Sequence, residues 1–227
     1  MRSLAKWHIW LGWLVGVPIV IWTLSGLVMV IKPIEEVRGN HLRVTAEPQA
    51  LPPGNPVPIA FQLSNARPIR EFRTRMQGAR PVTTVTYMDG RTERYDARKG
   101  TPIDPMDETE ARELVANEIV GGDAVASARL YAADKPPFDF RREIAVWQVA
   151  LEDGTHVYVG ADTGEIEAVR TRWWRIFDFM WGLHIMDLQT REDTSHPILI
   201  IFAALSLLGS LIGTVLLFRR RRRRVTA

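Results

Sequence analysis

The sequence predicts a membrane protein in which two transmembrane α-helices flank one α+β ectodomain. Two runs without charged residues, 9–31 and 194–218, each exceed the roughly 20 residues that a helix needs to cross a hydrocarbon core about 30 Å thick. All acidic residues lie between these runs, from Glu35 to Asp193. This middle segment also contains a hairpin pattern that occurs twice. We therefore expect an ectodomain built from two similar units, each a helix with antiparallel strands.

The basic residues at the two ends predict the orientation. Arg2 and Lys6 precede the first run, and six arginines, 219–224, follow the second. Because Lys- and Arg-rich flanks stay in the cytoplasm, both ends are expected there. The middle segment carries 21 basic residues against 26 acidic ones. The absence of cysteine excludes disulfides and cysteine-ligated clusters. We expect a bacterial inner-membrane protein with both termini cytoplasmic and a periplasmic ectodomain.

Two other interpretations of the ends are weaker. A cleaved signal peptide is the rival interpretation of the first run, but the run is longer than the apolar region of such a peptide, roughly 7–15 residues, and no A-x-A site follows it. The arginine block at 219–224 has the composition of a nucleic-acid-binding patch. Directly after a membrane span, it is explained more simply as an anchor that attracts anionic lipid head groups. The membrane is therefore an expected partner and nucleic acid is not.

The repeated pattern consists of an Asp-Gly pair followed ten residues later by a glycine. The first copy runs from Asp89-Gly90 to Gly100, and the second from Asp153-Gly154 to Gly164. Asp-Gly between strand-like runs predicts a type I′ hairpin, since both residues tolerate positive φ. The later glycine predicts a second turn. The same module therefore recurs with a displacement of 64 residues.

The apolar spacing around these turns predicts the elements and the domain boundaries. Residues 108–119 have helix periodicity, and helix plus antiparallel strands predicts an α+β layer. Further expected elements are a short helix near 59–63 and strands at 69–74, 82–88, 92–95, 126–131, 144–151 and 155–159. The expected parts are 1–32 (N-terminus and first span), 33–57 (Pro-rich linker), 58–104 and 105–172 (the two units), 173–193 (interfacial aromatic helix), 194–218 (second span) and 219–227 (Arg-rich tail).

The second unit resembles a PepSY domain. Trp147-Gln148-Val149 precedes Asp153-Gly154, and residues 158–166 match the element Y-V-x-x-D-T-G-E-I. With membrane helices on both sides, the chain is similar to the PepSY-associated transmembrane family, which includes ferric-siderophore reductase-like and iron-regulated membrane proteins. The resemblance implies that b-type haem is bound through membrane histidines. Larger members of the family have about four spans, whereas this chain has two.

Three histidines near the predicted membrane boundaries are candidate haem ligands: His8, His184 and His196. Ionisable groups in such positions often have a function, and neutral imidazole is a suitable axial ligand for haem iron. His184 lies in an aromatic segment that is typical of a helix in the membrane interface. These residues are also the candidate metal ligands, through the haem iron, and no catalytic residue is expected.

Each span also contains a G-x-x-x-G motif, which lets another helix approach closely. Gly12 and Gly16 share a helical face with His8, and Gly209 and Gly213 form the motif of the second span. Small residues beside a histidine leave room for a porphyrin. Helix packing and a belt of tryptophans explain the same residues without any cofactor, so both interpretations stay open.

The predicted orientation limits how the histidines can combine. His8 begins the first span on the cytoplasmic side, and His196 begins the second on the periplasmic side. A core about 30 Å thick separates them, so one iron cannot bind both. His184 lies on the same side as His196 and is its expected partner. A haem at His8 requires a second copy of the chain, hence a homodimer, or another membrane subunit.

Two functions follow from these expectations. The first is a haem-b electron carrier of ferric-reductase type, with a separate cytoplasmic reductase as donor because the chain has no flavin or nicotinamide motif. The second is a non-enzymatic membrane-anchored PepSY module that binds or regulates a periplasmic partner protein through its sheet edges. No hydrolase motif such as H-E-x-x-H or G-x-S-x-G is present.

Overall fold

The computed structural model describes residues 2–45, 49–56, 58 and 67–225, and the chain divides into two compact units. The helical unit comprises residues 1–34 and 173–227, and the sheet domain comprises residues 35–172. The boundary therefore falls close to the predicted change from membrane segments to ectodomain.

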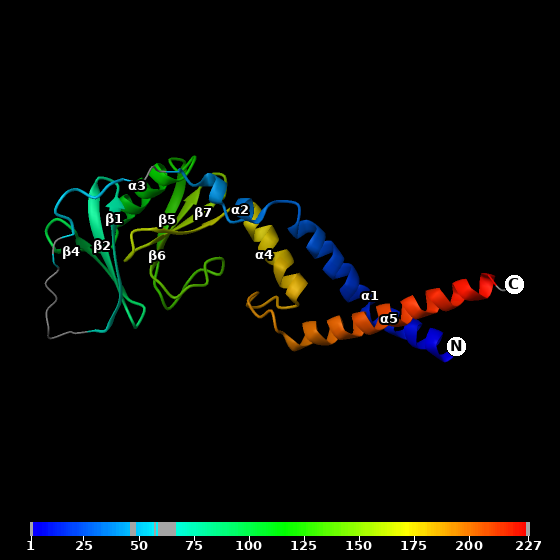
Figure 1. Cartoon of the computed structure of the whole chain (residues 1–227). Helices are drawn as coiled ribbons and strands as arrows, with labels where there is room; N and C mark the ends of the chain where they lie inside the picture. The colour runs from blue at the N-terminus through cyan, green and yellow to red at the C-terminus, as the bar shows by residue number, and fades with distance from the viewer. Residues whose placement is uncertain (1, 46–48, 57, 59–66, 226–227) are drawn as a thin grey trace. The chain divides into compact units, whose positions relative to one another are not determined.

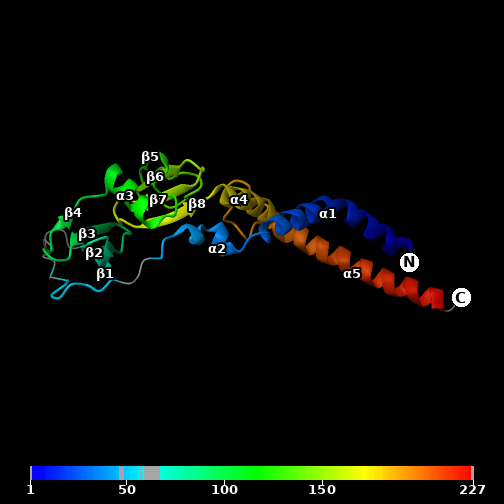
Figure 2. The ribbon, with the colours of Figure 1, turned by 90° about the horizontal axis from the view of Figure 1, so that it is seen from above.

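The helical unit contains a long antiparallel helix pair. Helices α1 (Arg2–Met29) and α5 (Pro197–Val225) contact and cross each other, and Arg2 lies at the same end of the pair as the C-terminal end of α5 (Figures 1 and 2). The stretches Ser3–Met29 and Pro197–Arg219 are long and apolar enough to cross a membrane, and most of their surface is exposed. Exposed apolar surface on this scale is unfavourable in water and favourable in lipid.

A third helix, α4 (Arg172–Ile185), precedes α5 in the helical unit. The sequence predicted an interfacial helix over 173–193, but the helix ends eight residues earlier because Met186 adopts a φ of 57°. This left-handed conformation ends the helical hydrogen-bond pattern. Lys32 lies over the ring of Trp173 at 5.8 Å, a cation–π contact that connects the end of the first membrane segment to the start of α4.

The sheet domain contains two four-stranded antiparallel sheets in which neighbouring strands follow one another along the chain. The first sheet is formed by β1 (Ile69–Gln77), β2 (Arg80–Tyr87), β3 (Thr92–Asp96) and β4 (Pro102–Ile103). The second is formed by β5 (Val125–Tyr131), β6 (Val146–Leu151), β7 (His156–Gly160) and β8 (Ile166–Arg170). The predicted strands are present with shifted ends, whereas β4 and β8 were not predicted.

Helix α3 (Glu108–Glu118) packs on the second sheet (Figure 1). It begins with a capping box, in which the Asp107 carboxylate accepts from the amide of Glu110 and the Glu110 carboxylate accepts from the amide of Asp107. Its apolar face contributes Ala111 and Val115 to a core with residues of the sheet and its flanks: Ile119, Val149, Leu151, Val157, Val159, Ile166 and Val169. The helix predicted over 108–119 is thus confirmed, and it ends one residue earlier than expected.

Both Asp-Gly hairpins form, but the predicted type I′ turn is wrong. Gly90 and Gly154 have φ of 86° and 81°, whereas neither aspartate has positive φ. Each aspartate instead accepts a hydrogen bond from the amide two residues later, at 3.0 Å for Asp89 and 2.7 Å for Asp153. This is a three-residue loop with a type I turn and a left-handed glycine, because the Asx bond stabilises the aspartate in its ordinary backbone region.

The chain before the first sheet is more ordered than the predicted linker. It contains helix α2 (Ile34–Val37), the 3₁₀ helix η1 (Asn40–Leu42) and a bridge between Arg43 and Ile119. The Arg43 guanidinium also donates to the carbonyl of Ile166 at 3.0 Å. The start of the predicted linker therefore packs on the second sheet. The predicted helix near 59–63 lies outside the described residues.

Candidate functional site

His184 is held against α1 by two hydrogen bonds. Its imidazole Nδ1 lies 3.0 Å from the hydroxyl of Ser25, and its backbone carbonyl accepts from the indole N–H of Trp22 at 2.8 Å. Gly26 lies beside the ring, where a built Cβ would be 3.4 Å from Cε1. Both the backbone and the ring of His184 are therefore held by hydrogen bonds, and the neighbouring residue on α1 is a glycine.

The hydrogen bonds of Ser25 determine the tautomer of His184. The Ser25 hydroxyl donates its one proton to the carbonyl of Trp22 at 3.1 Å. With its proton used in this way, the hydroxyl is an acceptor for Nδ1–H of His184; in that tautomer the lone pair of the neutral imidazole is on Nε2. No described residue forms a hydrogen bond with Nε2. Ligating histidines are typically oriented in this way, through a hydrogen bond to the other ring nitrogen.

His8 lies at the opposite end of α1 and packs against α5. A built Cβ on Gly213 would be 2.8 Å from Cε1 of His8, so a glycine is required for the imidazole to fit there. The Nδ1 atom of His8 is buried and has no hydrogen-bond partner. Seventeen residues separate His8 from Ser25, about 26 Å along the helix axis, so the structure does not bring His8 and His184 together.

The two G-x-x-x-G motifs differ in their surroundings. Gly209 and Gly213 contact α1 through Leu11 and His8, whereas no atom lies within 4 Å of a Cβ built on Gly12 or Gly16. The second motif therefore packs within the chain. The first presents an open surface in the described structure.

His196 directly precedes α5, and its Nδ1 atom is buried without a hydrogen-bond partner. Because α1 and α5 are antiparallel, this position lies at the same end of the helix pair as His184. The structure thus places two of the three candidate ligands at one end and His8 at the other. Among the described residues, no group of three or more His, Asp or Glu side chains is placed to hold a metal ion.

The loop between α4 and α5 is built around Asp187. Its carboxylate accepts from the amides of Gln189 and Thr190 and from the Thr190 hydroxyl. The amides of Glu192 and Asp193 donate to it as well, each at 3.2 Å. Nearby, the Arg191 guanidinium pairs with Asp178 of α4 at 2.5 Å, and both side chains are largely buried. This network could not be predicted from the sequence, because its members share neither periodicity nor a motif.

A model of the PepSY-associated TM region matches residues 5–227. The chain belongs to this family. The resemblance found in the sequence is thereby confirmed, and with the two apolar helices it identifies this PepSY-associated chain as a membrane protein. No curated protein and no solved structure matches it.

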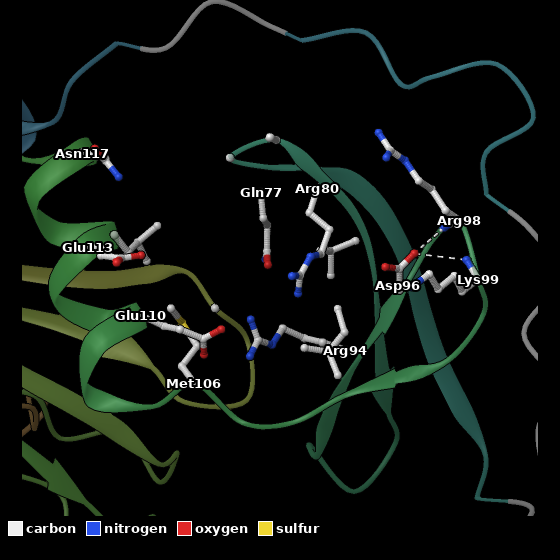
Figure 3. Close-up of a pocket in the computed structure, with 16 residues that line it drawn as sticks. Gln77, Arg80, Arg94, Asp96, Arg98, Lys99, Met106, Glu110, Glu113 and Asn117 are labelled. Atoms are coloured by element: carbon white, nitrogen blue, oxygen red, sulfur yellow. Dashed lines mark hydrogen bonds between the residues drawn. The ribbon is translucent and has the colours of Figure 1, made fainter.

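The sheet domain of this PepSY-associated protein contains an open cleft of about 600 Å³ (Figure 3). One wall is α3, with Glu110, Glu113 and Asn117, and the other is the first sheet and its β3–β4 turn (Figure 3). The sheet wall is basic through Arg80, Arg94, Arg98 and Lys99. No sequence motif marked these residues, since they are a few of the 29 Lys and Arg side chains.

Arg94 is the buried member of this wall, with 6 % of its surface exposed. One terminal nitrogen donates to the carbonyl of Asp104 at 2.8 Å, and Nε has no partner. Burial lowers the pKa of the Arg94 guanidinium and the nearby Arg80 charge adds to that effect, while the Glu110 and Asp162 carboxylates oppose it. A desolvated guanidinium with an unused donor is costly unless a further acceptor reaches it.

The same side chain connects the two sheets. Arg94 packs against Gly164 in the β7–β8 turn, where a built Cβ would be 2.5 Å from its terminal nitrogen. Two side chains of β1 contact this turn too: Gln77 donates to the carbonyl of Thr163 at 3.1 Å, and Arg75 pairs with Glu165 at 2.7 Å. The D-T-G-E turn that carried the family resemblance is therefore a contact point for the first sheet.

Proposed function

We propose that this protein is a transmembrane electron carrier of ferric-reductase type that binds haem b through its membrane-boundary histidines. The observation that carries the proposal is the orientation of His184. Its Nδ1 lies 3.0 Å from the Ser25 hydroxyl, and Nε2 forms no hydrogen bond with the described residues; in the tautomer with the proton on Nδ1, the Nε2 lone pair is available. Haem iron requires such a nitrogen.

The residues of the helical unit fit a haem on three counts. Nε2 of His184 is available, Gly26 leaves space beside its ring, and His196 lies at the same end of the helix pair with an unpartnered Nδ1. His184 and His196 would hold one haem within the chain. When bound, the haem would supply one-electron transfer between ferric and ferrous iron. Ser25 keeps the His184 proton on Nδ1, and Trp22 fixes the backbone from which the ring projects.

The other end of the helix pair would serve a second haem in a homodimer. Among the described residues, Nδ1 of His8 has no hydrogen-bond partner, and no atom lies within 4 Å of a Cβ built on Gly12 or Gly16 of the adjacent face. A second copy packed on this face would bring two His8 side chains together and give four helices. Two haems at opposite ends would form an electron path across the membrane, supplied by a separate cytoplasmic donor.

The test is the absorption spectrum of the full chain, purified in detergent after expression with ample haem. The wild type is expected to show a Soret band, and His184→Ala is expected to lose most of it. His41→Ala is the control, because His41 is exposed on η1 in the sheet domain. Ser25→Ala removes only the orienting hydroxyl and is expected to weaken haem affinity by about 10–100-fold.

Two results would contradict the proposal. One is a wild type without a Soret band under these conditions. The other is a His184→Ala variant that retains haem as well as the wild type does.

The alternative function is a membrane-anchored module that binds a partner protein by strand addition. It is favoured by β1, an edge strand whose first five residues are exposed. Arg70, Arg73 and Arg75 on this strand count against it, since edge charges are a common protection against strand pairing. A pull-down in which the full chain captures a partner, and loses it when β1 is substituted by prolines, would support the alternative.

A further inference from the structure

The cleft of the sheet domain has charge of opposite sign on its two walls. Glu110 and Glu113 project from α3, and Arg80 and Arg94 project from the first sheet (Figure 3). The volume of about 600 Å³ lies within the range of small-molecule sites, roughly 300–1,000 Å³. A molecule that carries both charges would therefore find a complementary group on each side.

The charged groups of the basic wall are only partly used by the protein. Arg80, Arg98 and Lys99 form no ion pair with any residue that the structure describes. The one acid on this wall, Asp96, accepts from the backbone amides of Arg98 and Lys99, at 2.8 and 3.1 Å. Its carboxylate therefore stabilises the β3–β4 turn, and among the described residues it forms no ion pair with the Arg98 or Lys99 side chain.

Arg94 gives the strongest indication of a ligand. It is 94 % buried, points across the cleft toward Met106 and Glu110, and retains an unpartnered Nε. The Arg80 guanidinium extends toward it (Figure 3). The Glu110 and Asp162 carboxylates offset part of the repulsion between these two guanidinium groups. A ligand carboxylate that accepts two parallel hydrogen bonds from Arg80 would offset it further.

The acidic wall also has carboxylate oxygens that form no hydrogen bond with the described residues. One oxygen of Glu110 accepts from the amide of Asp107 in the capping box, at 3.2 Å, which leaves the other oxygen for a donor. Glu113 is exposed and forms no hydrogen bond or ion pair with the described residues. An ammonium group with three donors would match these two carboxylates.

We propose that this cleft binds a small zwitterion of the class of free short peptides. The carboxylate would lie at Arg80 and Arg94, and the ammonium group would face Glu110 and Glu113. This site is separate from the histidines of the helical unit. Its test does not depend on whether haem is bound.

The experiment is calorimetric titration of the full chain in nanodiscs with trialanine and its blocked forms. Free trialanine is expected to bind saturably, and N-acetylated and C-amidated trialanine are each expected to bind at least tenfold more weakly. The loss of one charge-assisted hydrogen-bonded group has roughly this effect. No saturable binding of free trialanine, or equal binding of either blocked form, would overturn the proposal.

Exposed charges of the two walls allow variants that fold. Arg80→Gln is expected to weaken binding of free trialanine about tenfold and to have little effect on the C-amidated form; Glu113→Gln should have the mirror-image effect. Arg91→Gln and Glu118→Gln are the matched controls: Arg91 lies in the β2–β3 turn and Glu118 in α3, both outside the cleft. If Arg80→Gln and Glu113→Gln bind as the controls do, the assignment is wrong.

Discussion

Gly164 shows how a single backbone position joins the two sheets. Its φ of 62° belongs to the left-handed region, and the terminal nitrogen of Arg94 occupies the space that a Cβ would need. Gly90 has a φ of 86° but no atom within 4 Å of its built Cβ. Both glycines therefore have a left-handed backbone conformation, but only Gly164 is closely packed.

We expect Gly164→Ala to destabilise the sheet domain by roughly 2–3 kcal/mol and Gly90→Ala by roughly 1 kcal/mol. The smaller value is the cost of a left-handed alanine, and the difference is the displacement of Arg94. Hydrogen exchange of the β7 and β8 amides in the full chain, compared with those of β2 and β3, measures both effects. Equal losses of stability in the two variants would show that displacing the Arg94 side chain has no energetic cost.

At the scale of elements, the loop between α4 and α5 depends on one carboxylate. The hydrogen bond from the Thr190 hydroxyl, with those from the Thr190, Asp193 and Glu192 amides, holds the pKa of Asp187 well below its ordinary value, although desolvation opposes this. Both oxygens accept from donors of the loop. In an asparagine, an NH₂ group would replace one of these two oxygens. This group is a donor and would face the N–H and O–H donors of the loop.

We expect Asp187→Asn to loosen this loop and to speed amide exchange at residues 189–193. In the wild type, the depressed folded pKa means that the contribution of Asp187 to stability is complete above the unfolded pKa of about 4 and is lost as the pH falls below it. Exchange rates of the wild-type loop should therefore rise toward those of the variant in acid, after correction for intrinsic exchange. A loop whose protection is the same in both proteins at neutral pH would contradict this account.

At the scale of the whole molecule, the helix pair has a predicted orientation across the membrane. The antiparallel pairing of α1 and α5 places the two ends of the chain at one end of the pair. The basic residues at both termini favour the cytoplasmic side for that end. The chain contains no cysteine, so single introduced cysteines can report the topology.

We expect a membrane-impermeant maleimide to label Met88→Cys in intact spheroplasts. Met88 is an exposed residue of the first hairpin in the sheet domain. Ser3→Cys and Thr226→Cys should be labelled only after the membrane is opened. Labelling of the terminal cysteines in intact spheroplasts would reverse the predicted orientation.

Most of the fold could be predicted from local sequence signals. The membrane helices follow from the length of the uncharged runs, α3 from its apolar periodicity, and the hairpins from the two Asp-Gly pairs. The type of hairpin turn could not be predicted, because the Asx bonds of Asp89 and Asp153 favour ordinary φ at the aspartates. The short strand β4 was missed because two residues carry no periodicity.

The sequence by itself determined the membrane class, the candidate histidines and the repeated unit, because each depends on residues close together along the chain. Only the tertiary structure decided what those residues contact. It placed the His184 ring beside the Ser25 hydroxyl, placed His8 on Gly213, and buried Arg94 in a cleft between α3 and the first sheet. These contacts join residues far apart in the sequence, whose proximity depends on packing rather than on any local pattern.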